Sequence, residues 1–242
     1  TITKRPVTLK SADLSKEYDG TALVNGATPV EVSGDGWAAG EGATYAFTGS
    51  QTAVGSSANA FTYTLNSNTK ADNYTITKEE GSLTVKDRAE KYQVTVVANS
   101  TSTTYDGRVH SAKGLESTTV IADGRTFTVE GLTTSNPEGT DAGEYTNHIT
   151  GTAVIKDKAG NDVTSQFKVT TVDGKLTIAK RAVTIKPVKA TKEYDGTPLV
   201  ATAFEVVSGS FAEGEGIESC TYGGQQIQAG TSESTIETVR PK

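Results

Sequence analysis

The sequence is poor in sulfur-containing residues, in basic clusters and in long apolar runs. It has no methionine and one cysteine, Cys220, so an intrachain disulfide is excluded. No apolar run approaches the roughly 20 residues that a membrane helix needs. The net charge is −6 and no block of Lys or Arg occurs. Because phosphate binding needs clustered positive charge, we expect no nucleic-acid partner. Because no long apolar run occurs, we expect no membrane insertion.

Large apolar residues are also scarce. Hydrophobic residues make up 34% of the chain, with 6 Phe and 1 Trp among 242 residues. Cores must therefore be thin and built mainly from Val, Ile, Leu and Tyr. Val and Thr suit a pleated, half-buried surface better than a helix, and no long segment has helical spacing. The composition predicts an all-β fold.

What the sequence does contain is a tripeptide, Tyr-Asp-Gly, that occurs three times. The tyrosines are separated by 105 − 18 = 87 and 194 − 105 = 89 residues. A period this regular indicates an array of one repeated unit. The repeated motif comprises Tyr18, Asp19, Gly20, Tyr105, Asp106, Gly107, Tyr194, Asp195 and Gly196.

Strand patterns recur around each motif. Apolar and polar residues alternate in Arg5–Lys10, Tyr92–Val97 and Arg181–Lys186, which predicts a first strand with one buried face. Asp-Gly between two short extended stretches predicts a β-hairpin, with the tyrosine anchored in the core. The patterns at Leu83–Lys86 and Leu176–Ala179 predict a closing strand, joined to the preceding strand by a turn.

These patterns divide the chain into four segments. Residues 1–4 resemble the last strand of a preceding repeat, 5–87 are repeat 1, 88–180 are repeat 2, and 181–242 are repeat 3, which is incomplete. Either the chain is an excerpt of a longer array, which we favour because open β edges are normally avoided, or a segment such as Thr1-Ile2-Thr3 of a neighbouring molecule completes repeat 3. Short junctions favour end-to-end modules, each about 35 Å long, in an elongated rod.

The residues around the motif resemble a known family. Lys16-Glu17-Tyr18-Asp19-Gly20-Thr21 and the matching run 192–197 are similar to the YDG/MBG-type tandem repeats of bacterial cell-surface proteins. The resemblance implies small β-sandwich-like modules, Ig-like or grasp-like, in stalks of wall-anchored or secreted adhesin-like proteins. It also implies an extracellular location, a monomeric rod within a longer chain, an unknown host or cell-wall ligand, and no catalysis or cofactor.

Three further kinds of site have a structural interpretation as their alternative. Asp19 with Glu17, and Asp195 with Glu193, offer oxygen ligands for calcium, but one carboxylate per turn favours a turn-forming role. Lys10 and Lys186 are placed for an isopeptide bond, yet no Asn occurs in the closing strands. Cys220 with Gln225 or Gln226 suggests a thioester, but a small apolar-like residue in a strand is favoured.

Aromatic and histidine side chains complete the list of candidates. Trp37 is either a sugar-stacking platform or, as its counterpart Phe211 indicates, an aromatic plug of the core. Asp141–Tyr145 resembles the tyrosine corner of immunoglobulin sandwiches. His110 and His148 have no neighbouring ligand residues in the sequence, so metal or acid–base chemistry is not expected.

Two functions follow. The first is a structural spacer made of tandem modules, without enzymatic activity. The alternative is that the modules themselves bind a host protein or glycan through their variable middle region. The alternative predicts an exposed aromatic patch near Trp37 or Phe127, whereas a spacer predicts polar faces.

Overall fold

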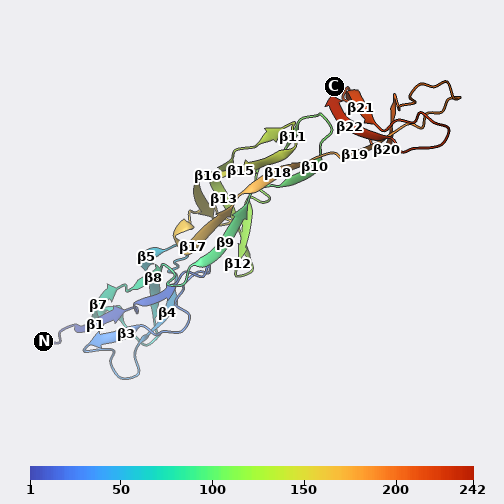
Figure 1. The fold of residues 1–242 in the computed structure, drawn as a ribbon. Helices are drawn as coiled ribbons and strands as arrows, with labels where there is room; N and C mark the ends of the chain where they lie inside the picture. The colour runs from blue at the N-terminus through green and yellow to red at the C-terminus, as the bar shows by residue number, and fades with distance from the viewer. The chain divides into compact units, whose positions relative to one another are not determined.

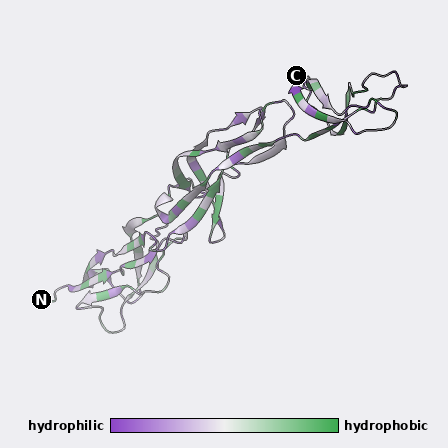
Figure 2. Ribbon diagram, viewed as in Figure 1, coloured by the Kyte–Doolittle hydropathy of each residue, from purple (hydrophilic) through white to green (hydrophobic).

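A computed structural model describes all residues, 1–242, and confirms the all-β prediction. Twenty-two strands form small sheets of two or three strands, and the only helical segments are two short 3-10 turns, η1 (Ala71–Asn73) and η2 (Thr164–Gln166) (Figure 1). None of the helices has the length and apolar character that crossing a bilayer requires. Figure 2 shows polar and apolar residues mixed along most strands, as expected for sheets with one buried face.

The chain forms two compact units. Unit 1 consists of Thr1–Val94, Thr119–Glu130 and Ala153–Thr170, and unit 2 consists of Thr95–Thr118, Gly131–Thr152 and Thr171–Lys242. Repeat 1 therefore lies in unit 1, repeat 3 lies in unit 2, and repeat 2 contributes residues to both.

In repeat 1, two strands near the start of the repeat each lie parallel to a strand near its end, in two different sheets. Its strands β1 and β7 are parallel neighbours in a sheet of order β3-β1-β7, while β2 and β8 are parallel neighbours in a sheet of order β2-β8-β5. A third sheet pairs β4 with β6. The strands are β1 (Arg5–Lys10), β2 (Leu14–Glu17), β3 (Glu31–Gly34), β4 (Ala43–Phe47), β5 (Gly55–Ala58), β6 (Phe61–Leu65), β7 (Tyr74–Glu79) and β8 (Ser82–Lys86).

The prediction of a hairpin at Tyr-Asp-Gly is wrong. Strand β2 ends at Glu17, and the residues after Gly20 form only a one-residue bridge, between Leu23 and Gln51. A two-residue type I′ hairpin needs positive φ at both central residues, but only Gly20 has it, at 70°. The turn predicted between the last two strands is present at Glu80–Gly81, but it does not form a hairpin, because β7 and β8 lie in different sheets.

A short corner joins the strands of each parallel pair. The chain turns at Ser11–Asp13 between β1 and β2, and at Glu80–Gly81 between β7 and β8. Ser11 Oγ accepts from the Gly81 amide at 2.9 Å and donates to the Asn59 carbonyl at 2.6 Å, while Asn59 Nδ2 donates to the Ala12 carbonyl at 2.8 Å. Ser11 and Asn59 are fully buried. Buried polar side chains thus bind the backbone groups at the corner, where hydrogen bonds between strands are interrupted.

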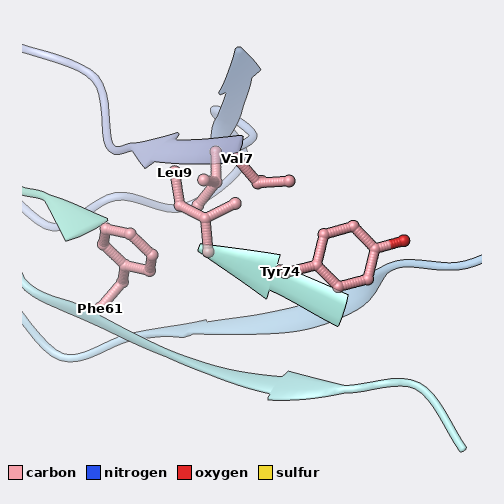
Figure 3. Close-up of a cluster of buried hydrophobic side chains, with 5 residues drawn as sticks. Val7, Leu9, Phe61 and Tyr74 are labelled. Carbon is pink, nitrogen blue, oxygen red and sulfur yellow. The ribbon is translucent and has the colours of Figure 1, made fainter. Parts of the chain in front are cut away.

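The core of repeat 1 lies beside β1. Figure 3 shows Val7 and Leu9 directed toward the rings of Phe61 and Tyr74. These residues and Val30 form one buried cluster. Burial of a side chain of this size contributes about 1.5–3 kcal/mol. The alternation predicted for Arg5–Lys10 therefore identified the strand that carries the core.

Repeat 2 has the same corner. Strand β10 is parallel to β18, the Asn147 Nδ2 donates to the Asn99 carbonyl at 3.1 Å, and the Lys175 amide donates to Ser100 Oγ at 3.1 Å. Asn147, like Asn59, is fully buried. The strands are β9 (Tyr92–Val97), β10 (Thr101–Thr104), β11 (His110–Ser111), β12 (Thr119–Ala122), β13 (Arg125–Thr134), β14 (Glu138–Gly139), β15 (Gly143–Asn147), β16 (Ile149–Lys156), β17 (Phe167–Val172) and β18 (Gly174–Ala179).

Repeat 2 also contains a true Asp-Gly hairpin, which the sequence reasoning missed. Ala122 pairs with Arg125, so Asp123 and Gly124 form a two-residue loop between β12 and β13. Both residues have positive φ, 51° and 71°. The same dipeptide thus forms a hairpin here and a different turn in the repeated motif.

Repeat 3 has four strands. Strand β19 (Val183–Pro187) pairs with β20 (Phe204–Gly209), and β21 (Ile217–Gly223) pairs with β22 (Thr235–Pro241), both antiparallel. A one-residue bridge between Leu199 and Gln226 matches the Leu23–Gln51 bridge of repeat 1. Repeats 1 and 3 therefore share this bridge.

Candidate functional site at the Tyr-Asp-Gly corners

The aspartate of the first motif organises its own turn. Asp19 Oδ1 accepts from the Thr21 amide at 2.8 Å, from Thr21 Oγ1 at 2.6 Å and from Lys16 Nζ at 2.7 Å. An aspartate that accepts from the backbone two residues ahead is a typical Asx turn. The carboxylate oxygen that a calcium site would use is therefore bound by residues of the turn itself.

The third motif repeats this arrangement. Asp195 Oδ1 accepts from the Thr197 amide at 2.9 Å, from Thr197 Oγ1 at 2.8 Å and from Lys192 Nζ at 2.8 Å. The lysine three residues before the aspartate and the threonine two residues after it are thus part of the motif. In the first and third repeats the structural motif is therefore Lys-x-Tyr-Asp-Gly-Thr.

The second motif lacks both the lysine and the threonine, and His110 supplies the missing donor. Its Nε2 lies 2.7 Å from Asp106 Oδ1, and the Arg108 amide donates to the same oxygen at 3.0 Å. The sequence pattern presents His110 only as a metal or acid–base candidate. Its position four residues after the aspartate is the signal that indicates its structural role.

Each motif aspartate has a pKa below its ordinary value. The hydrogen bond from Lys16, followed by that from Thr21, lowers the pKa of Asp19, and Lys192 and Thr197 lower that of Asp195 in the same way. For Asp106 the main cause is the hydrogen bond with His110. The folded turn therefore favours the ionised carboxylate in all three repeats.

The three motif tyrosines differ in burial. Tyr18 is 3% exposed, as predicted for a core anchor, Tyr105 is half-buried and Tyr194 is 66% exposed. Burial is the main cause that raises the pKa of Tyr18. The prediction of a core anchor is confirmed for Tyr18 and is wrong for Tyr194, because the Tyr194 side chain is largely exposed.

An arginine near the start of repeat 2 binds the motif of repeat 1 within unit 1. Arg88 Nη1 donates to the Tyr18 carbonyl at 3.1 Å, and its guanidinium lies 4.1 Å from the centre of the Tyr92 ring. The Arg88 amide donates to Oε1 of the fully buried Gln166 at 3.0 Å. Arg125 Nη1 donates to the neighbouring Asp19 carbonyl.

The same kind of contact occurs between repeats 2 and 3 within unit 2. Arg181 Nη1 donates to the Tyr105 carbonyl at 3.3 Å, while its Nε and Nη2 bind Ser210 of its own repeat at 2.5 and 2.6 Å. The Tyr105 hydroxyl donates to Glu215, and this contact is the main cause that raises the pKa of Tyr105. The carbonyl of the motif tyrosine is thus the acceptor at both junctions.

Arg5 occupies the position in repeat 1 that corresponds to Arg181. Its Nε donates to the Gly36 carbonyl at 2.8 Å, and its Nη2 donates to the Asp35 carbonyl. Arg5 thus binds the loop after the third strand of its own repeat, as Arg181 does through Ser210. We name the motif carbonyl and the arginine that binds it the junction pair.

The remaining candidates have structural positions. Trp37 is half-buried, stacks edge-on against Tyr74 at 5.0 Å between ring centres and donates to Tyr45 Oη at 3.3 Å. Phe127 is 4% exposed and packs against Phe167. The aromatic patch expected for a binding module is therefore not formed by Phe127, and Trp37 packs on the core of repeat 1.

The reactive candidates also lie in ordinary environments. Lys186 pairs with Glu205 at 3.0 Å, and Lys10 is exposed at the end of β1. Cys220 is half-buried in β21 opposite Val239, which confirms the prediction that it lies in a strand. Gln226 donates to the Gln228 carbonyl at 2.7 Å. Gln225 lies directly before it, at the end of the loop that follows β21.

Two last predictions concern repeat 2. The Tyr145 hydroxyl donates to the Asp141 carbonyl at 3.0 Å, which confirms the expected tyrosine corner. His148 Nδ1 lies 2.7 Å from Asp173 Oδ2 on the surface. No group of three or more His, Cys, Asp or Glu residues is arranged to hold a metal ion.

Replacing Asp19 separates its two roles. Asp19→Asn keeps an oxygen for the Thr21 amide but loses the ion pair with Lys16, so we expect a loss of about 0.5 kcal/mol at pH 7, since the pair is partly solvated. Asp19→Ala loses the turn as well, and we expect about 1 kcal/mol. Urea unfolding of the intact chain measures both.

The pH dependence gives the control. Because the folded turn lowers the pKa of Asp19, its contribution is present above the unfolded pKa of about 3.9 and is lost as the pH falls toward the folded value. The wild-type chain should therefore lose more stability than Asp19→Asn between pH 5 and pH 2. Equal losses in the two proteins would exclude a role for the ionised carboxylate.

The chain is all-β, and at two of its three Tyr-Asp-Gly turns the tyrosine carbonyl accepts a hydrogen bond from an arginine that lies later in the chain. Comparison with protein families agrees for the first repeat: residues 3–81 match the model of the YDG domain. This part of the chain is thus a YDG-type domain. Comparisons with curated proteins and with solved structures give no significant match.

Proposed function

We propose that this chain is a run of spacer modules from a bacterial cell-surface or secreted adhesin-like protein, and that it performs no catalysis. In this proposal the modules are small sandwich-like domains placed end to end in an elongated rod, outside the cell, within a longer chain. Any partner, a host or cell-wall ligand, is bound elsewhere in the parent protein.

The observation that carries the proposal is the junction pair. In both junctions an arginine of the following repeat donates to the carbonyl of the preceding motif tyrosine, at 3.1 Å for Arg88 and 3.3 Å for Arg181. A repeated contact that fixes one module against the next is what a spacer requires, because short linkers alone leave hinge freedom. The YDG-type domain at residues 3–81 agrees with a repeat protein of this kind.

Small-angle scattering of the whole chain tests the proposal. We expect an elongated particle with a narrow distribution of conformations. A compact particle would contradict the spacer function. The alternative, binding through the middle region of each module, is supported less well, because Phe127 is buried and Trp37 is packed against Tyr74.

Loss of the junction arginines should loosen the modules without unfolding them. For Arg88→Ala and Arg181→Ala together we expect a broader distribution of particle dimensions in scattering, because each junction loses one hydrogen bond to the carbonyl of the motif tyrosine. Each hydrogen bond contributes about 0.5–1.5 kcal/mol. Far-UV circular dichroism should stay unchanged.

Arg240→Ala is the matched control, because Arg240 pairs with Glu218 inside repeat 3 at 2.8 Å and touches no junction. Its scattering profile should match the wild-type profile. If the double variant also matches the wild type, the junction pair does not restrain the modules.

A further inference from the structure

One loop of repeat 1 contains the single Asn-Gly sequence of the chain, Asn25-Gly26. The loop lies in unit 1, between the Leu23–Gln51 bridge and strand β3. Asn25 is 7% exposed, whereas Gly26 is exposed, and a Cβ atom at Gly26 would meet nothing within 4 Å. A buried side-chain amide thus lies next to an unobstructed backbone amide.

The side chain of Asn25 is held through only one of its two polar atoms. Its Oδ1 accepts from the Thr28 amide at 3.0 Å, which directs the side chain toward the residues that follow it and draws electrons from Cγ. Its Nδ2 is buried and has no hydrogen-bond partner. The carbonyl carbon is therefore polarised, while nothing holds the amino group.

The backbone amide of Gly26 is free to react with that carbon. It donates to no acceptor in the structure. Glycine has no Cβ atom, so no side chain shields the nitrogen. Attack of this nitrogen on Asn25 Cγ closes a five-membered ring, because the two atoms belong to neighbouring residues.

Repeat 3 forms the same part of the loop without this pair of residues. Counted from the Leu199–Gln226 bridge, Ala201 corresponds to Asn25 and Thr202 corresponds to Gly26. Ala201 is 5% exposed, so a methyl group occupies the buried position. The loop therefore folds without an asparagine or a glycine at these two positions.

Other side chains that could react in this way are protected. Asn59 and Asn147 donate through Nδ2 to backbone carbonyls at 2.8 and 3.1 Å, and each precedes a residue with a side chain. Asp19 and Asp195 precede glycine, but hydrogen bonds from a lysine and a threonine lower the pKa of each. They stay ionised, and a carboxylate resists attack by nitrogen.

We propose that Asn25-Gly26 is a site at which the chain modifies itself. The Gly26 nitrogen forms a bond to Asn25 Cγ, the bond from Cγ to Nδ2 breaks, and Nδ2 leaves as ammonia with the proton of the Gly26 amide. Water then opens the resulting succinimide ring at either carbonyl, which leaves an aspartate or an isoaspartate at position 25. The inference does not depend on the spacer function, since it rests on the chemistry of one loop.

The modification changes the loop in two ways. A carboxylate replaces a neutral amide at a buried position, where the charged form is disfavoured. An isoaspartate also lengthens the backbone between the bridge and β3. We expect faster hydrogen exchange at the Leu23 amide, which donates to the Gln51 carbonyl at 2.7 Å. Because the product accumulates with time, it distinguishes older chains from newly made ones.

Incubation of the intact chain in mildly alkaline buffer tests the inference. Released ammonia is measured enzymatically, and mass spectrometry of peptides with electron-transfer fragmentation locates the product and separates aspartate from isoaspartate. We expect Asn25 to react before any other asparagine. Gly26→Ala should slow the reaction at least about 10-fold, because a Cβ atom shields the attacking nitrogen. Gly216→Ala, at another glycine whose Cβ would meet nothing within 4 Å, should react at the wild-type rate.

The chain unfolded in urea separates the effect of the fold from that of the local sequence. We expect the folded chain to react at least as fast as the unfolded chain, because the Thr28 amide polarises Asn25 only in the folded loop. Asn25→Ala, which copies Ala201, should fold normally and lose the early release of ammonia. A folded chain that reacts more slowly than the unfolded chain would overturn the inference. So would equal rates in Gly26→Ala and the wild type, or earlier modification of another asparagine.

Discussion

Gly81→Ala is expected to destabilise repeat 1 by about 3 kcal/mol or more. A Cβ atom at Gly81 would lie 2.4 Å from the carbonyl oxygens of Ser11 and Ala12. Both oxygens belong to the backbone of the corner between β1 and β2, so neither can move without separating the parallel pairs. A glycine at which another backbone approaches this closely has no room for a side chain.

Gly174→Ala should have the same effect in repeat 2, because its Cβ would lie 2.2 Å from the Asn99 carbonyl oxygen. Hydrogen exchange along the intact chain separates the two effects, since each variant should speed exchange in its own repeat. Gly26→Ala is the control, because a Cβ there meets nothing within 4 Å. A Gly81→Ala variant as stable as Gly26→Ala would show that the backbone of the corner can shift to accommodate a side chain.

Phe61→Ala is expected to cost about 3–5 kcal/mol, the range for removing a buried aromatic side chain. Phe61 is 1% exposed, its ring centre lies 6.2 Å from those of Tyr45 and Phe47, and Lys78 Nζ lies 5.0 Å above it. It is also one wall of the cluster that holds Leu9. Removing the ring leaves a cavity in a thin core that has few other large residues.

Thermal unfolding and exchange of the β1 amides measure this loss. Phe61→Leu should recover more than half of it, because it keeps most of the buried volume. Ile121→Ala, at a side chain 73% exposed in β12, should change stability by less than about 0.5 kcal/mol. Equal effects at Phe61 and Ile121 would mean that the cluster does not determine the stability of repeat 1.

Much of the fold was predictable from alternation. Arg5–Lys10 and Tyr92–Val97 are predicted as strands with these bounds and form β1 and β9. Each has one face that is buried, so the pattern directly records the environment. The short strands β2 (Leu14–Glu17) and β10 (Thr101–Thr104) have no such pattern, because they are held by parallel neighbours far away in the sequence.

The candidate site was predictable only in part. Repetition identified the Tyr-Asp-Gly residues, but it gave no sign that the tyrosine carbonyl binds an arginine 70 or 76 residues later. Nor did it identify Asn59 and Asn147, since a buried asparagine in a corner looks in sequence like any asparagine of a loop. Contacts of this kind depend on which strands become neighbours, and parallel pairing between the start and the end of a repeat cannot be read from local pattern.

The pairing of β1 with β7 and of β2 with β8 determines how repeat 1 responds to tension. Its first two strands each run beside one of its last two strands in the same direction, so a pull on the two ends of the repeat slides one strand of each pair along the other. The ladder bonds are then loaded in shear, and many must break together before the repeat extends. The rate of this step governs forced unfolding. The corner holds the two parallel pairs together, so it also contributes to the resistance of the repeat to force.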